Sequence, residues 1–147
     1  MDEKEILAGI VAVLQDLHPE VPVIVDGQAP ENGAFLQIVP GIFKQEQKLD
    51  NRYRREQTYQ ICYTPQEGEE KVERCNDMSA SLWLGLEYVP MGGYWVRGEE
   101  MKREIQEGVM QFSVTYKWFV RKIKPEAPKM EALFMDPQTK TREGSQS

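Results

Sequence analysis

Few residues in this chain of 147 could perform catalysis, and their spacing in the sequence does not group them. The one histidine, His18, precedes a proline at the expected end of a helix, where a capping or surface role is the ordinary one. Cys62 and Cys75 are isolated, and lone thiols in a cytosolic chain are mostly small buried apolar side chains. Without a second histidine or an activated cysteine, these residues support no catalytic triad.

Adjacent carboxylates occur at Glu69–Glu70 and at Glu99–Glu100. Neighbouring residues on a helix or a strand point apart, so each pair would be a poor acid–base dyad and is interpreted as a solvated charged surface. The sequence also has no Gly-rich phosphate-binding loop and no metal-ligand spacing. We therefore predict that the protein is not an enzyme and that it has no catalytic residue, no cofactor and no metal site.

Charge and composition narrow the class of protein further. The chain has 24 acidic and 18 basic residues and a net charge of −6, which argues against specific nucleic-acid binding. Its longest apolar run, Ile6 to Leu14, is too short to cross a bilayer, and its first residues are not a basic signal sequence. We expect a cytoplasmic globular protein with no membrane partner.

The strongest structural signal is the stretch 108–122, GVMQFSVTYKWFVRK. Apolar and polar side chains alternate along it, which predicts a long strand with one face on a core and the other in water. Only Phe119 breaks the alternation. The positions assigned to the core are Met110, Phe112, Val114, Tyr116, Trp118 and Val120.

Two helices and several shorter strands are expected around this strand. The predicted elements are a helix at 3–17, an edge strand at 21–25, a hairpin of strands 34–47 and 52–64, a helix at 69–86, a loop at 90–93, a strand at 94–97 and a strand at 99–106. Whether 94–106 forms one strand or two is left open. This order predicts an α+β two-layer sandwich, a mainly antiparallel sheet with long hairpins and two helices on one face.

The regular pattern stops after Ile123, where prolines and a polar end follow. We predict a single α+β domain at 1–123 and a proline-containing flexible C-terminal tail at 124–147. One apolar island interrupts the tail, and it either packs back on the body or docks on a neighbouring molecule. Its residues are Met130, Leu133, Phe134 and Met135.

The far end of the first hairpin, around residues 42–56, is mostly polar and charged, so we expect it to project from the body. Its mixed charges suit either an edge that discourages aggregation or a contact surface for another subunit. The residues alone do not favour one over the other. The candidate protein-contact residues are Lys44, Lys48, Arg52, Arg54 and Arg55, with Leu133 and Phe134 from the tail island.

The aromatic residues offer one further candidate site. Tyr59, Tyr94, Tyr116 and Trp118 could line a pocket for stacking a ligand in the concave face of the sheet. Ordinary packing in the core and sheet is the favoured explanation for them.

Four features of the sequence resemble the tail terminator, or tail-completion, proteins of long-tailed phages and prophages of Gram-positive bacteria. They are the opening amphipathic helix with Pro22-Val23-Ile24, the segment FLQIVPG at 35–41, NRYRR at 51–55 leading into YQICY at 59–63, and EGVMQFSVTY at 107–116. The resemblance covers residues 3 to about 122, and the tail after Lys124 lies outside it.

The resemblance implies a non-enzymatic virion protein that forms a ring, typically a hexamer, at the head-proximal end of the tail tube. The implied partners are other copies of the chain, the tail tube protein and a head-completion or connector protein. The implied location is the host cytoplasm during assembly and then the virion tail. Two alternatives stay open: a head-completion or connector protein, and a small ligand-binding α+β domain.

Overall fold

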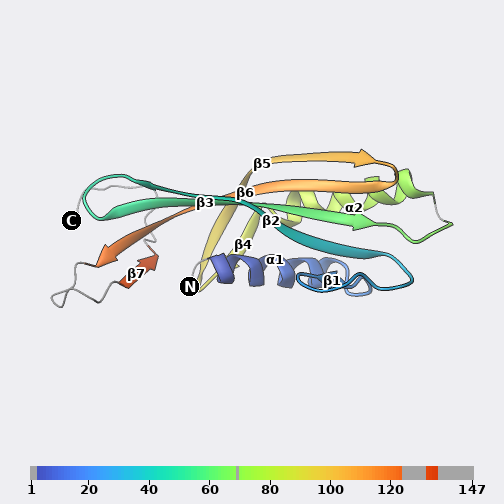
Figure 1. Ribbon diagram of the computed structural model, residues 1–147, viewed down its shortest axis with the longest axis horizontal. Helices are drawn as coiled ribbons and strands as arrows, with labels where there is room; N and C mark the ends of the chain where they lie inside the picture. The colour runs from blue at the N-terminus through green and yellow to red at the C-terminus, as the bar shows by residue number, and fades with distance from the viewer. Residues whose placement is uncertain (1–2, 69, 124–131, 136–147) are drawn as a thin grey trace.

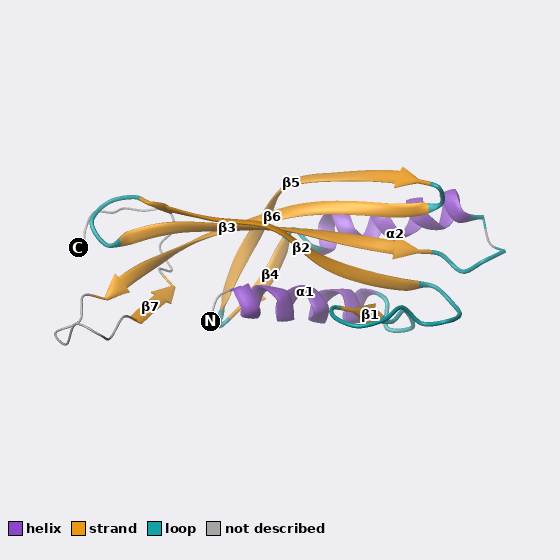
Figure 2. Cartoon of the chain, viewed as in Figure 1, coloured by secondary structure: helices purple, strands orange, loops and turns teal. Residues whose placement is uncertain are grey.

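The computed structural model describes residues 3–68, 70–123 and 132–135 (Figure 1). Within these residues, two helices and seven strands follow one another (Figure 2). Their bounds are α1 (Glu3–Leu17), β1 (Val23–Ile24), β2 (Phe35–Gln47), β3 (Arg52–Thr64), α2 (Lys71–Gly85), β4 (Tyr88–Met91), β5 (Tyr94–Gln106), β6 (Val109–Ile123) and β7 (Ala132–Met135).

The strands form one twisted sheet in the order β1-β2-β3-β6-β5-β4, and β7 pairs with the end of β6. Among the described pairings, β1 with β2 is parallel and the others are antiparallel. Both helices lie on the same side of the sheet (Figure 1). The predicted α+β two-layer fold is therefore confirmed.

The central strand β6 supplies the largest part of the core. Its six alternate side chains from Met110 to Val120 are buried in one core cluster with residues of both helices and of the β4–β5 hairpin. Phe119, which broke the sequence pattern, lies on the opposite face, and the Arg52 guanidinium sits 4.3 Å from its ring centroid. Phe119 therefore leaves the alternation of β6 intact, since it takes its regular place on the helix-free face. There the Arg52 guanidinium covers its ring.

One segment differs from the sequence expectation. Residues 90–93 were predicted as a loop, but Pro90 and Met91 end strand β4, and the turn is confined to Gly92 and Gly93. Proline is tolerated because, among the described strands, β4 pairs with β5 alone and is an edge strand. The other side of β4 lies against α1, where a Cβ atom at Gly9 would collide with the Pro90 carbonyl oxygen.

The sequence left open whether residues 94–106 form one strand or two, and in the structure they form the single strand β5. It is one strand that pairs with β4 at one end and with β6 at the other, and it bends between the two at Gly98. A Cβ atom at Gly98 would lie 2.7 Å from the Leu86 carbonyl oxygen and 2.8 Å from Val114 Cγ2. Only glycine permits this close approach of β5 to the end of α2 and to β6.

A buried tyrosine fixes the same junction. Tyr116 on β6 donates its hydroxyl hydrogen to the Leu86 carbonyl oxygen at the end of α2, at 2.7 Å. Burial raises the pKa of Tyr116 above its ordinary value, and the neighbouring Tyr59 adds to the rise, so the hydroxyl keeps its proton. This bond attaches helix α2 to the middle of the sheet.

We predict that Tyr116→Phe lowers the free energy of unfolding by about 1–3 kcal/mol, because the buried Leu86 carbonyl loses its partner. Urea denaturation at neutral pH measures the change. Tyr88→Phe is the matched control, since the Tyr88 side chain is half exposed and lies outside the buried core. Equal losses in the two variants would contradict this account of the junction.

Candidate protein-contact surface

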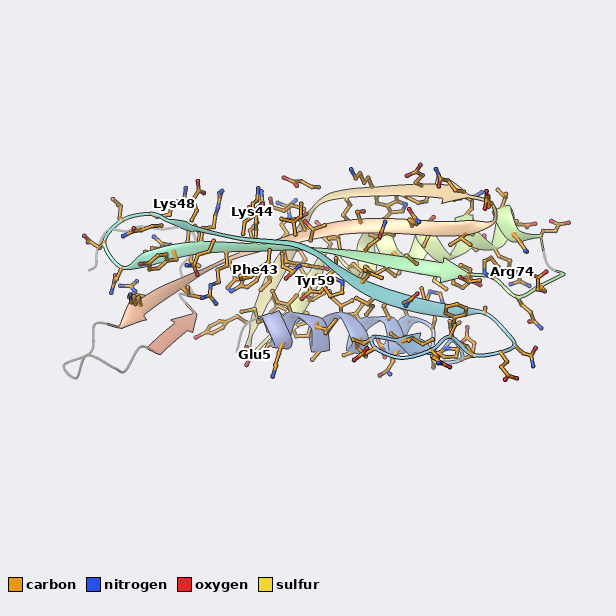
Figure 3. All side chains as sticks on the ribbon, in the orientation of Figure 1. Glu5, Phe43, Lys44, Lys48, Tyr59 and Arg74 are labelled. Carbon is orange, nitrogen blue, oxygen red and sulfur yellow. The ribbon has the colours of Figure 1, made fainter. Side chains whose placement is uncertain are left out.

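The distal half of the β2–β3 hairpin, residues 42–56, is called the arm below. It extends past the ends of both helices at the left of Figure 3, which labels Phe43, Lys44 and Lys48 along it. Every residue of β2 from Val39 to Gln47 is exposed, whereas Leu36 and Ile38 nearer the helices are buried. The hairpin therefore projects, as its charged sequence predicted.

A bulge separates the arm from the body of the sheet. The register between β2 and β3 shifts between Pro40 and Phe43. The buried Gln57 side chain donates to the carbonyl oxygens of Gly41 at 3.1 Å, Ile42 at 3.4 Å and Thr58 at 3.0 Å. Gln57 thus bonds backbone groups that the bulge takes out of the ladder. Its place on the core face of β3, in step with Tyr59 and Ile61, was visible in the sequence but was not singled out.

The helix-free face of the arm carries a chain of ion pairs. Lys44 lies 3.3 Å from Glu56, Arg54 lies 3.0 Å from Glu46, and Lys48 lies 3.3 Å from Glu46. The hydrogen bond and charge of Lys48, with the charge of Arg54, lower the pKa of Glu46. Exposed pairs of this kind are individually weak, so they order the arm's side chains without locking them.

The five basic residues predicted as one cluster are divided between two faces. Arg52 and Arg54 lie on the helix-free face with Lys44, and Lys48 is at the turn. Arg55 points to the other face, where its Nε donates to Gln45 at 2.6 Å and its guanidinium lies 5.7 Å from the Phe43 ring. Any partner on one face of the arm would therefore meet a subset of the predicted residues.

The two tail candidates, Leu133 and Phe134, fall in strand β7. Their backbones pair with Lys122 and Arg121 of β6, while their side chains lie outside what the structure describes. Residues 133–135 of the apolar island thus lie in a strand that pairs with the body through β6, and Met130 lies outside the described residues. The boundary predicted at residue 123 and the flexibility predicted for 124–147 remain predictions.

The Glu99–Glu100 pair behaves differently from the expectation that its side chains point apart. A bulge after Glu99 and a positive φ of 54° at Glu100 bring both carboxylates to one ammonium group. Lys117 Nζ lies 3.4 Å from Glu99 and 3.3 Å from Glu100. Burial alone would lower the pKa of Lys117, but these two carboxylates outweigh it and raise the pKa. The result is a structural ion cluster at the base of the arm.

The aromatic set does not form a ligand pocket. Tyr59, Tyr116 and Trp118 are core residues, whereas Tyr94 is partly exposed at the β4–β5 turn. Burial raises the pKa of the Cys62 and Cys75 thiols, which favours their protonated form. Within the described ranges, no group of three metal-ligating side chains is found, and no helix is long and apolar enough to cross a membrane.

The protein is thus a folded body with a projecting, charged hairpin. Comparison with known protein families identifies the family to which the chain belongs. A family model described as phage tail terminator protein matches residues 5–128, most of the chain. The chain belongs to the phage tail terminator family. As a tail terminator family member it has a role in phage tail assembly, within a family of typically non-enzymatic structural proteins.

Other comparisons add little to the family assignment. Among curated proteins none matches this chain. One solved structure, of a protein described without a function, is 17% identical to it and covers 86% of this chain and 99% of its own, with a TM-score of 0.41. A likeness at that score carries no argument, so the family match stands on the sequence.

We predict that Gln57→Met lowers the free energy of unfolding by about 1–3 kcal/mol, because it leaves bulge carbonyl groups without their donor. Chemical denaturation checks this. The control is Gln60→Met on the same strand, since Gln60 makes one longer side-chain bond, to Gln111 at 3.3 Å. If Gln57→Met were no more destabilising than Gln60→Met, the side chain would not hold the bulge.

Proposed function

We propose that this protein ends the growth of the phage tail tube by capping it with a ring of its own copies, a hexamer. The ring then offers the surface to which the head-completion or connector protein joins. In this role the protein is not an enzyme. It works in the cytoplasm of the bacterial host during assembly and stays in the virion tail.

Family membership over residues 5–128 is the observation that carries this proposal. The arm supports it, since a projecting two-stranded extension gives a subunit of modest size the reach to touch a neighbour. A closed ring also requires a heterologous contact, in which two different surfaces of each copy meet. The arm is one such surface, and its candidate contact residues are Lys44, Lys48, Arg52, Arg54 and Arg55.

The test is electron microscopy of particles made by the parent phage or prophage after deletion of this gene. We expect tails of uncontrolled, excessive length, because nothing stops tube growth. Supplying the wild-type gene in trans should restore a single tail length, which excludes an effect of the deletion on neighbouring genes.

Two other outcomes would redirect the assignment. Tails of normal length beside unjoined heads would move the protein to the head-completion or connector role. Unchanged, infectious particles would contradict both assembly roles and return attention to a ligand-binding function.

A further inference from the structure

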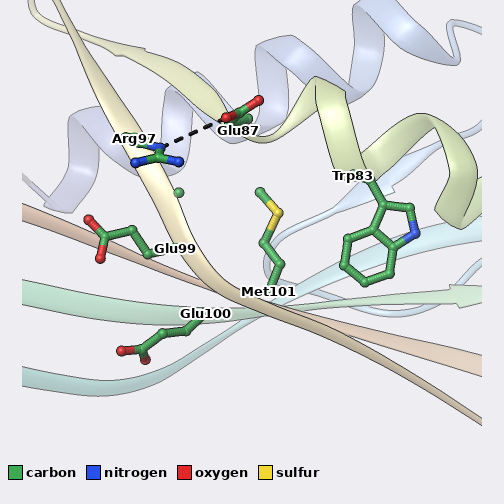
Figure 4. A pocket seen from close by; sticks show the side chains of 7 residues that line it. Trp83, Glu87, Arg97, Glu99, Glu100 and Met101 are labelled. Carbon is green, nitrogen blue, oxygen red and sulfur yellow. Dashed lines mark ion pairs between the residues drawn. The ribbon is translucent and has the colours of Figure 1, made fainter.

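A shallow depression lies where β5 bends away from the sheet (Figure 4). Its volume is about 570 Å³, and its lining combines carboxylates with an aromatic ring and a thioether. The side chains that line it are Trp83, Glu87, Arg97, Glu99, Glu100 and Met101. In Figure 4 the two carboxylates of β5 lie on one side, Trp83 lies on the other, and Met101 lies between them.

Exposed aromatic side chains continue from this depression along the β4–β5 ribbon. Arg97, which lies 3.8 Å from Glu87, is the register partner of Tyr88, and Trp95 shares the same face of the ribbon. Tyr88 is 50% exposed and Trp95 is 67% exposed. Grouped exposed aromatics beside an arginine have the composition of a protein-binding hot spot. The depression with Tyr88 and Trp95 is called the β5 shelf below.

The arm has the properties that would complement the β5 shelf. Ile42 is 70% exposed and Leu49 is 72% exposed, so two large apolar side chains stand free near its base and at its tip. Residues 42–56 contain five basic and three acidic residues, a positive surplus in a chain whose net charge is −6. The lining of the shelf contains three carboxylates and one arginine, and Lys117 lies against Glu99 and Glu100, so one negative charge remains in excess. The arm and the β5 shelf therefore both expose apolar side chains, and their surplus charges are opposite in sign.

We propose that the arm of one copy docks on the β5 shelf of the next copy. Leu49 or Ile42 would pack on Trp95 and Tyr88, and Lys44 and Lys48 would lie near Glu87 and Glu100. The two surfaces are different parts of the same chain, so the contact is head-to-tail and can close into a ring. The inference deepens the proposed function, because it names the surfaces from which the ring is built.

Charge reversal tests the pairing of signs. Lys44→Glu with Lys48→Glu, or Glu87→Lys with Glu100→Lys, should each weaken self-association by roughly tenfold or more, measured by light scattering over a dilution series. A chain carrying all four changes should associate again, because the proposed contacts between copies then pair opposite charges. Glu104→Lys, farther along β5 and outside the lining, is the control for the change in net charge. Circular dichroism and thermal unfolding establish that each variant is folded.

If the variant with all four charge reversals is folded but does not regain self-association, the proposed pairing of the arm with the β5 shelf is wrong. A second measurement does not depend on those variants folding. A benzophenone amino acid is placed at position 49 of the full chain, and labelled and unlabelled protein are mixed. Crosslinks should join position 49 to residues 83–101 of a different copy, whereas the same group at position 106 should not reach them.

The outcomes separate this inference from the proposed function. Crosslinks from position 49 to other parts of a neighbour, in protein that still forms rings, would overturn the docking of the arm on the β5 shelf and leave the ring intact. Wild-type protein that stays monomeric at every concentration would also overturn it. Neither the crosslinking result nor the association result changes the tail-length phenotype expected for the gene deletion. That phenotype tests tube capping independently.

Discussion

The architecture depends on a mismatch between the lengths of its helices and its strands. A helix rises about 1.5 Å per residue and a strand about 3.3 Å, so 15 residues span about 22 Å in α2 and about 50 Å in β6. The two helices therefore cover only part of the central strands. The β4–β5 hairpin folds beneath the sheet and lies against α1, which adds cover, and β2 and β3 beyond it become the exposed arm. The charges of the arm follow from this lack of cover.

The parts of the fold set by periodicity were predictable from the sequence. The alternation in 108–122 predicts β6 and its buried face, and the apolar spacing in 3–17 predicts α1, because in both cases each residue's environment follows from its own phase. Pro90 shows where this reasoning fails. A proline two residues before a Gly-Gly pair is typical of a loop, but pairing with β5 makes residues 88–91 a strand, and α1 lies against it.

The candidate surface was harder to predict than the fold. A bulge changes which side chains of a strand share a face, so the alternation in the sequence no longer gives the face beyond it. On an ideal strand Glu99 and Glu100 would point to opposite faces, but the bulge in β5 turns both toward Lys117. The bulge in β2 likewise decides which arm side chains share a face. The sequence did contain one signal of the bulge in β2, the polar residue Gln57 at a position that faces the core. A buried amide requires hydrogen-bond partners, and only an irregular backbone leaves such partners free.

The ion pairs of the arm also affect what it can recognise. Lys44, Glu46, Arg54 and Glu56 neutralise one another on the helix-free face, so the arm does not present a uniform positive field to a polyanion. Such a surface discriminates by the positions of its charges and apolar groups, and it steers distant partners weakly. That suits the proposed role, in which the protein binds at one place on the tail. Specificity then depends on the geometry of the arm, which the bulge and Gln57 determine.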